Sequence, residues 1–126
     1  MDSEIAQLVK VNMAFHNLNK SAEGKLGLSL VQYYFLVTLR DMPGCSPQRL
    51  ATAIGMHPST MSQSLKRLVK KEAVFVGDDP KDARKKILSM TRAGNHLLIK
   101  FSRGIGELLS TREFEKYFIF VRLGKG

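Results

Sequence analysis

The sequence predicts a mainly α-helical fold with one small β-hairpin. Apolar residues recur every three or four positions through most of the chain, which is the period of an amphipathic helix. Between residues 74 and 90 the period shortens to two, as in β-strands. Ser-Pro and Pro-Gly pairs divide the helical stretches into short elements. With 126 residues, the chain has the size of a single domain.

The first two helices are predicted at residues 4–20 and 30–42. Gly24 and Gly27 end the first helix, and Ser29 can cap the second by accepting a hydrogen bond from its exposed amides. The Pro43-Gly44 pair is a stop signal. The apolar stripe of the first helix is expected to contain Ile5, Leu8, Val11, Phe15 and Leu18.

Two short helices are predicted to follow, separated by a tight turn. Ser46 can cap the first helix, with Pro47 at its first helical position, and Gly55 suits its end because glycine tolerates the left-handed conformation. The second helix begins at Pro58 and runs to about Lys71. Its buried stripe is predicted to be Met61, Leu65 and Leu68. Its other face carries Ser59, Thr60, Ser62, Gln63, Lys66, Arg67 and Lys70.

Residues 74–76 and 87–90 are predicted to be the strands of a hairpin, and residues 77–84, rich in turn formers, a long charged tip. Thr91 can then cap a long helix. Its 3,4,3 apolar spacing is close to that of a coiled-coil seam and is made by Leu98, Phe101, Ile105 and Leu108. Gly104 and Gly106 lower its helix propensity unless they serve a bend or close packing. A last helix after Ser110-Thr111 would present Phe114, Tyr117, Phe118 and Val121.

The charge of the chain favours a polyanionic partner. The net charge is +9, and residues 57–92 hold nine basic and four acidic residues. Such an excess points to nucleic acid ahead of anionic membrane, although a solvated basic surface without a partner would look the same. No apolar run reaches the roughly 18 residues that span a bilayer. Residues 1–4 carry acids where a secretory signal carries Lys or Arg, so we expect a cytoplasmic protein.

The helices at 47–54 and 58–71 have the lengths and turn chemistry of a helix-turn-helix. A recognition helix touches base edges with its first residues, while cations further along meet phosphates. The order of residues here fits that division, because Ser59, Thr60, Ser62 and Gln63 come first and Lys66 and Arg67 follow. An ordinary amphipathic surface helix would have a similar polar, solvent-exposed face. This helix alone therefore does not distinguish a recognition helix from an ordinary surface helix.

The hairpin adds a second candidate contact. An arginine on a basic loop beside such a helix can enter the minor groove, where the negative potential is concentrated, and Arg84 is the candidate. Lys81 and Lys85 add positive charge to the same loop. Asp82 is expected to orient the tip by binding backbone amides or a cation. The alternative for Asp82 and Arg84 is a simple turn with a surface ion pair of little energetic value.

These residues together resemble the MarR family of multiple-antibiotic-resistance regulators, over nearly the whole chain. The most specific part is Asp79-Pro80-Lys81-Asp82-Ala83-Arg84, which, with the strand and the Thr-x-x-Gly helix start after it, is similar to the family's wing signature. Further matches lie in the predicted second helix and helix-turn-helix, at Leu28-Ser29, Gln32, Leu36, Leu39, Gln48-Arg49-Leu50-Ala51, Ile54-Gly55, Ser59-Thr60 and Leu65-Lys66-Arg67-Leu68.

The resemblance implies one winged helix-turn-helix domain over residues 1–126, with the DNA-binding part at about 29–91. It also implies a homodimer joined by the helices at about 4–20 and 95–123, which would read two half-sites roughly 34 Å apart in a pseudopalindrome. Arg84 would enter the minor groove and Asp82 would brace the wing. Family members commonly repress transcription until a small aromatic or lipophilic ligand binds. Candidate ligand-binding residues are Phe15, Leu18, Tyr33 and Tyr34, for which core packing is the alternative.

Other functions find less support. His16, His57 and His96 lie far apart without metal-ligand spacing, so no metal or other cofactor is expected. Nucleophile elbows and phosphate-binding glycine loops are absent from the sequence, which argues against an enzyme. Cys45 is expected to be a small buried residue and not an oxidant sensor. The alternatives are a DNA-coating protein of low specificity and a regulator that has lost DNA binding.

Overall fold

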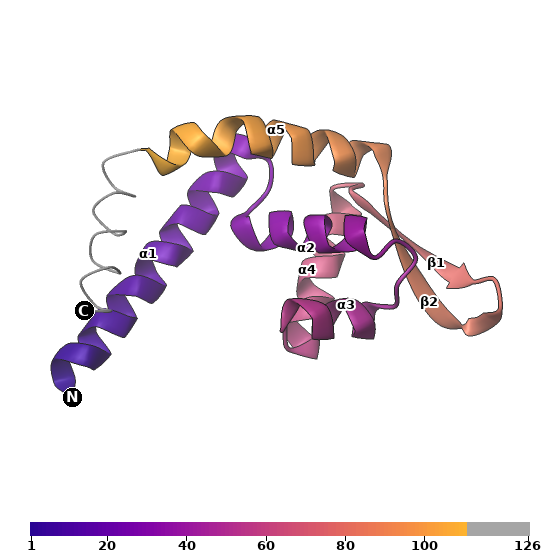
Figure 1. Ribbon diagram of the computed structural model, residues 1–126, viewed down its shortest axis with the longest axis horizontal. Helices are drawn as coiled ribbons and strands as arrows, with labels where there is room; N and C mark the ends of the chain where they lie inside the picture. Colours follow the sequence, from indigo (N-terminus) through magenta and orange to yellow (C-terminus); the bar gives the residue numbers. More distant parts are fainter. Residues whose placement is uncertain (111–126) are drawn as a thin grey trace. The chain divides into compact units, whose positions relative to one another are not determined.

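The structure is a computed structural model that describes residues 1–110 (Figure 1). The last predicted helix, with Phe114, Tyr117, Phe118 and Val121, and part of the 95–123 segment lie outside the described residues. The chain divides into one unit of Met1–Leu30 with the chain from Lys100 onward, and a second unit of Val31–Ile99. Among the described residues, no helix is long and apolar enough to cross a membrane. The described elements are α1 (Asp2–Leu26), α2 (Leu30–Asp41), α3 (Pro47–Ile54), α4 (Pro58–Lys70), β1 (Val74–Asp79), β2 (Asp82–Met90) and α5 (Arg92–Leu109).

Helix α1 is longer than the predicted 4–20. Gly24 lies inside the helix, and the end comes only at Gly27, whose left-handed conformation (φ 83°) lets its amide donate to the carbonyl of Glu23 at 3.0 Å. A glycine within a helix costs about 1 kcal/mol relative to alanine but does not end it. The left-handed residue ends it.

One face of α1 leaves apolar side chains exposed. Ala14 and Ala22 are buried, whereas Leu8 is 71% and Phe15 48% exposed. The apolar stripe predicted for this helix therefore divides between two environments, because Leu8 and Phe15 are exposed whereas Val11 and Leu18 are partly buried. The exposed apolar side chains of α1 and its N-cap are Met1, Ile5, Leu8, Val9, Met13 and Phe15.

Gly104 of α5 allows close packing within the first unit. A Cβ atom at this position would overlap Cδ2 of Leu26, the last residue of α1. This contact confirms that Gly104 serves close packing. A Cβ at Gly106 would meet nothing within 4 Å, so no described neighbour requires glycine there.

The second unit contains the predicted helix pair. Ser46 caps α3 by accepting a hydrogen bond from the amide of Arg49 at 3.2 Å, and Gly55 ends α3 with φ 80°. Residues of α2, α3, α4 and β2 form the core of the unit, and the hairpin projects away from the helices (Figure 1). Its fully buried large side chains are Phe35, Leu36, Leu39, Leu50, Leu68 and Leu88.

The hairpin differs from the prediction in its tip. The strands extend to Asp79 and Asp82, so only Pro80 and Lys81 lie between them, instead of a loop over 77–84. The antiparallel register runs from Val74↔Met90 to Asp78↔Lys86 and then shifts to Asp79↔Asp82. Hydrogen bonds between backbone groups do not require apolar side chains. The strands can therefore extend into charged residues, where the alternating apolar pattern has ended.

Thr91 joins three elements. It caps α5 as predicted, because its Oγ1 accepts a hydrogen bond from the amide of Gly94 at 3.0 Å. The same hydroxyl donates to the carbonyl of Glu72 at 2.5 Å, and the Thr91 amide donates to the carbonyl of Ala73 at 3.0 Å. Glu72 adopts a positive φ of 61° in the turn after α4. The end of α4 and the starts of β1 and α5 are thus tied together.

Cys45 is buried, as predicted, with 7% of its surface exposed. Its carbonyl accepts a hydrogen bond from the amide of Leu88 at 2.9 Å, which fixes it beside β2. Burial raises the pKa of the Cys45 thiol, and a backbone hydrogen bond and the charge of nearby Arg49 offset this only in part. A raised pKa means less of the nucleophilic thiolate at neutral pH.

We therefore expect the Cys45 thiol to react at least about tenfold more slowly with a disulfide reagent in the folded protein than in denaturant at pH 8. The absorbance released on reaction with 5,5′-dithiobis(2-nitrobenzoic acid) measures both rates. Equal rates would show that Cys45 is accessible and would reopen an oxidant-sensing role.

Candidate nucleic-acid interface

The start of α4 is fixed by His57 and Pro58. Nδ1 of His57 accepts a hydrogen bond from the amide of Ser59 at 3.2 Å and lies 2.8 Å from the Ser59 hydroxyl. His57 is thus the N-cap of α4, and Pro58 occupies the first turn. The Ser59 hydroxyl has a partner within the chain, which the sequence pattern did not reveal.

The predicted base-contacting and phosphate-contacting side chains of α4 all lie on its solvent face. Met61 is 3% exposed and Leu68 is fully buried, so the opposite side of the helix packs into the core, with Leu65 partly buried. This division agrees with the sequence pattern, since the polar side is open to solvent. The residues on the solvent face are Ser59, Thr60, Ser62, Gln63, Lys66, Arg67 and Lys70.

The far end of α4 is anchored by a polar contact between elements. Nζ of Lys71 donates a hydrogen bond to Oε1 of Gln32 at 2.6 Å, and Gln32 on α2 is only 3% exposed. A buried amide needs such a partner, because an unsatisfied polar group in a core costs about 1–3 kcal/mol. The contact therefore fastens the C-terminal end of α4 to α2.

A pocket of about 420 Å³ lies where α3 meets the start of α4. Gln48 and Thr52 of α3 line it together with Ser62 of α4, and the buried Ala51 and Met61 also take part. The pocket adds polar side chains of α3 to the surface beside the recognition helix. The sequence pattern did not predict this pocket, because its existence depends on how the two helices cross.

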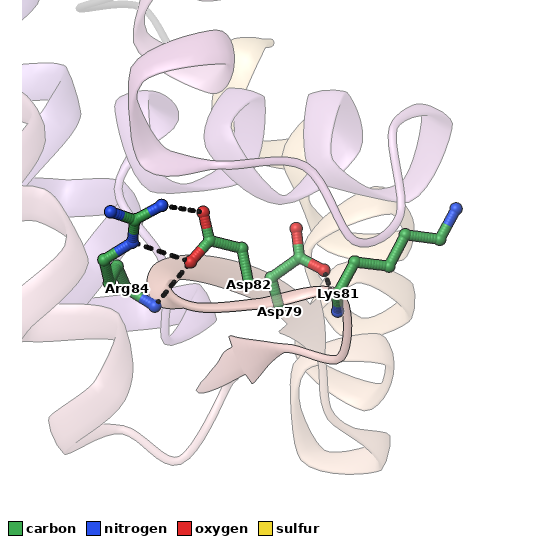
Figure 2. Close-up of polar contacts among 4 residues, drawn as sticks. All are labelled: Asp79, Lys81, Asp82 and Arg84. Carbon is green, nitrogen blue, oxygen red and sulfur yellow. Dashed lines mark hydrogen bonds and ion pairs between the residues drawn. The ribbon is translucent and has the colours of Figure 1, made fainter.

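At the wing, Asp82 holds Arg84 through both side chain and backbone. Oδ1 of Asp82 accepts hydrogen bonds from the amide and from Nε of Arg84, both at 3.1 Å, and Oδ2 accepts one from Nη2 at 3.3 Å (Figure 2). The Arg84 guanidinium, followed by the Arg84 amide, lowers the pKa of the Asp82 carboxyl. The Arg84 side chain remains 91% exposed. Both kinds of contact expected for Asp82, to a backbone amide and to a cation, are therefore present.

The other charged residues of the wing have different surroundings. Nζ of Lys86 lies 2.5 Å from Oδ1 of Asp78 across the strands. Lys81 and Lys85 are exposed, and Figure 2 shows the Lys81 side chain extending away from the turn. The wing thus presents two lysines and one arginine braced by a carboxylate.

The four candidate ligand-binding residues lie in different units. Phe15 and Leu18 are on α1, and Tyr33 and Tyr34 are on α2. None of the four is fully buried. Phe15 and Tyr34 are about half exposed, so the alternative that they pack in the core is wrong for these two residues. Among residues 1–110 there is no group of three His, Cys, Asp or Glu side chains that could hold a metal ion.

Comparison with known proteins identifies the family. A family model described as MarR family matches residues 26–85. The HTH-type transcriptional regulator BilQ of Clostridium symbiosum (strain WAL-14163) is 31% identical over 111 residues, which cover 84% of this chain and 77% of BilQ. The chain belongs to the MarR family. The HTH-type transcriptional repressor NicR of Pseudomonas putida (strain KT2440) is 34% identical over 84 residues, covering 64% of this chain and 53% of NicR.

Solved structures with the same fold agree with this membership. A probable transcriptional regulator from Pseudomonas aeruginosa has a TM-score of 0.68 at 24% identity and covers 92% of each chain. A mutant MarR of E. coli in complex with operator DNA has a TM-score of 0.62 at 17% identity and covers 85% of this chain and 76% of that one. CouR of Rhodococcus jostii RHA1 bound to p-coumaroyl-CoA has a TM-score of 0.61 at 24% identity and covers 78% of this chain and 68% of the CouR chain.

Membership in the MarR family places the chain among DNA-binding transcription regulators, a family that does not consist of enzymes. The winged helix-turn-helix predicted from the sequence is confirmed by α3, α4 and the β1–β2 hairpin, together with the MarR folds that they match.

Proposed function

We propose that this MarR-family regulator is a cytoplasmic repressor that binds a pseudopalindromic operator as a homodimer and releases it when a small molecule binds. The observation that carries the proposal is the surface formed by two features of the second unit. The solvent face of α4 is polar at its start and basic further along, and the wing carries an exposed Arg84 braced by Asp82. This combination suits base edges, phosphates and a minor groove.

In the proposed complex, the exposed side chains divide into three roles. Ser59, Thr60, Ser62 and Gln63 face base edges in the major groove, where glutamine pairs well with adenine. Lys66 and Arg67 on α4, with Lys81 and Lys85 on the wing, neutralise phosphates, and each such contact steepens the salt dependence of binding. Arg84 enters the minor groove.

The exposed apolar face of α1 supports the homodimer. Leu8, at 71% exposure, is one of six large apolar side chains that this helix and its N-cap leave open. A contiguous apolar surface of this kind is unusual for a monomer and typical of an interface. We expect a sedimentation mass of about twice 14.1 kDa. A strictly monomeric protein at micromolar concentration would contradict the proposed recognition of two half-sites.

Sequence specificity is the sharpest test of the proposed function. Duplexes selected by the protein from a random library should bind at least about a thousandfold more tightly than random duplex at the same salt concentration. A low-specificity architectural protein uses the same cations, so it would bind both duplexes equally. Equal binding would therefore reject the repressor and leave that alternative.

An effector of aromatic or lipophilic character is proposed, with Phe15, Leu18, Tyr33 and Tyr34 among the residues that contact it. The rings of Phe15 and Tyr34 are each about half exposed and thus accessible to a ligand, and CouR, of the same fold, has been crystallised with p-coumaroyl-CoA. Screening aromatic acids and their thioesters for a raised melting temperature and for release of the selected duplex tests this part. A compound that does both identifies the effector class.

Gln63→Ala is expected to change base preference more than overall affinity. Gln63 is exposed on the first half of α4, where a lost bidentate contact costs about 1–3 kcal/mol of discrimination against the wrong base. Repeating the selection with the variant measures the preference. Lys66→Ala is the matched comparison, since it should weaken all duplexes alike and reduce the salt slope by about one for each protomer that contacts the DNA. The reverse pattern would show that the two roles are wrongly assigned.

A further inference from the structure

Arg84 lies in a part of the wing where strand pairing does not fix its direction. Asp78 is paired with Lys86 and Asp79 with Asp82, so residues 83–85 have no Cα partner on β1. Arg84 is the middle residue of this irregular segment. A bulged segment lacks the regular ladder that sets side-chain direction in a strand. The direction of the Arg84 side chain therefore depends on its other contacts.

Two carboxylates at the turn make contacts that act one after the other on Arg84. Asp82 contacts the amide, Nε and Nη2 of Arg84. Asp82 itself stands opposite Asp79 across the two-residue turn, and Oδ1 of Asp79 accepts a hydrogen bond from the amide of Lys81 at 2.9 Å (Figure 2). An aspartate that binds the amide two residues ahead stabilises a turn locally. Each carboxylate thus fixes the backbone just ahead of it.

We infer that Asp79 is a positioning residue for Arg84. By holding the amide of Lys81, Asp79 fixes the turn that places Asp82, and Asp82 in turn aims the guanidinium of Arg84. The inference rests on the proposed contact between Arg84 and DNA. It assigns to Asp79 a role in affinity although its own carboxylate binds the backbone of the turn and not the partner.

The sign of the expected effect separates this role from simple electrostatics. An acidic residue on a DNA-binding wing repels phosphates, so removal of its charge alone would tighten binding. A positioning role predicts weaker binding when the hydrogen bond to Lys81 is lost. Asp79→Ala removes the charge and the acceptor, whereas Asp79→Asn removes the same charge but keeps an Oδ1 acceptor.

Asp78 offers a matched control on the same strand. Its carboxylate contacts the side chain of Lys86 at 2.5 Å and is 60% exposed. Asp78→Ala therefore makes the same change in net charge one residue away, without removing a hydrogen bond to the turn. It also releases Lys86 as a free cation, so binding should be unchanged or tighter.

The experiment measures dissociation constants for a fluorescent duplex selected by the unaltered protein, at fixed salt. We expect Asp79→Ala to weaken binding about three- to tenfold for each wing that reaches the DNA, the range that one such hydrogen bond supports, and Asp79→Asn to stay within about twofold. In an Arg84→Ala background, Asp79→Ala should add no further loss, because its effect passes through Arg84.

Three results would overturn the inference. Equal weakening by Asp79→Ala and Asp79→Asn would show that a retained Oδ1 acceptor does not rescue binding, so the hydrogen bond to the Lys81 amide would not be responsible. An undiminished loss in the Arg84→Ala background would mean that Asp79 acts on the wing independently of Arg84. If Arg84→Ala alone bound as tightly as the unaltered protein, the wing contact of the proposed function would fail first and the inference with it.

Discussion

Replacing Arg84 with alanine is expected to weaken binding to the selected duplex by roughly 1–3 kcal/mol for each wing that reaches the DNA, the range for a specific arginine contact. Two wings in a homodimer would double the loss, to a total between about 30-fold and 10⁴-fold in the dissociation constant. The Arg84 side chain is 91% exposed, and its ion pair with Asp82 lies at the surface. Stability should therefore change by no more than about 0.5 kcal/mol. Fluorescence anisotropy and urea unfolding measure the two quantities.

Two companion variants show whether the effect belongs to the geometry of Arg84 or to its charge. Arg103→Ala removes the same charge from an exposed position on α5, in the other unit, and should alter affinity only slightly. Arg84→Lys keeps the charge but loses the planar fork that meets both oxygens of Asp82, so we expect intermediate affinity. If Arg84→Ala and Arg103→Ala lost affinity equally while Arg84→Lys lost none, only net charge would matter and the minor-groove role would be wrong.

Local signals in the sequence predicted the helix-turn-helix closely. Ser46, Pro47, Gly55 and Pro58 mark the observed ends of α3 and the start of α4 to within one residue. These signals work because a cap, a proline ring or a left-handed glycine acts on amides within a few positions of itself. The exposed face of α4 was predictable from the helical spacing of its apolar residues.

Contacts between distant residues were not predictable in this way. Gln32 is buried although polar, because Lys71, 39 positions along the chain, satisfies its oxygen. The strands extend through charged residues because backbone pairing across the hairpin is independent of side-chain polarity. The contact between Asp82 and Arg84 was predictable from their spacing in the sequence. The hydrogen bond from the Lys81 amide to Asp79 was not, because it depends on the two-residue turn and on a strand register that the sequence pattern did not indicate.

Gly94→Ala is expected to destabilise the fold by about 1–3 kcal/mol, the usual cost of forcing a methyl group into a packed site. A Cβ at Gly94 would overlap the carbonyl oxygen of Ala73 and approach Cγ of Met90 to 2.9 Å. The carbonyl of Ala73 already accepts the amide of Thr91 at 3.0 Å, so the start of α5 could move only by weakening that bond. The shift of the urea midpoint, at one fixed protein concentration, measures the loss.

Gly106→Ala is the matched control within the same helix. A Cβ there meets no atom of the described residues within 4 Å, so the helix propensity of alanine should dominate and stabilise the protein by about 0.5–1 kcal/mol. Opposite signs for two Gly→Ala changes on one helix would separate packing from propensity. If Gly94→Ala also stabilised the protein, α5 could start without close contact to Ala73, and the tie that Thr91 makes between the recognition helix, the wing and α5 would not be rigid.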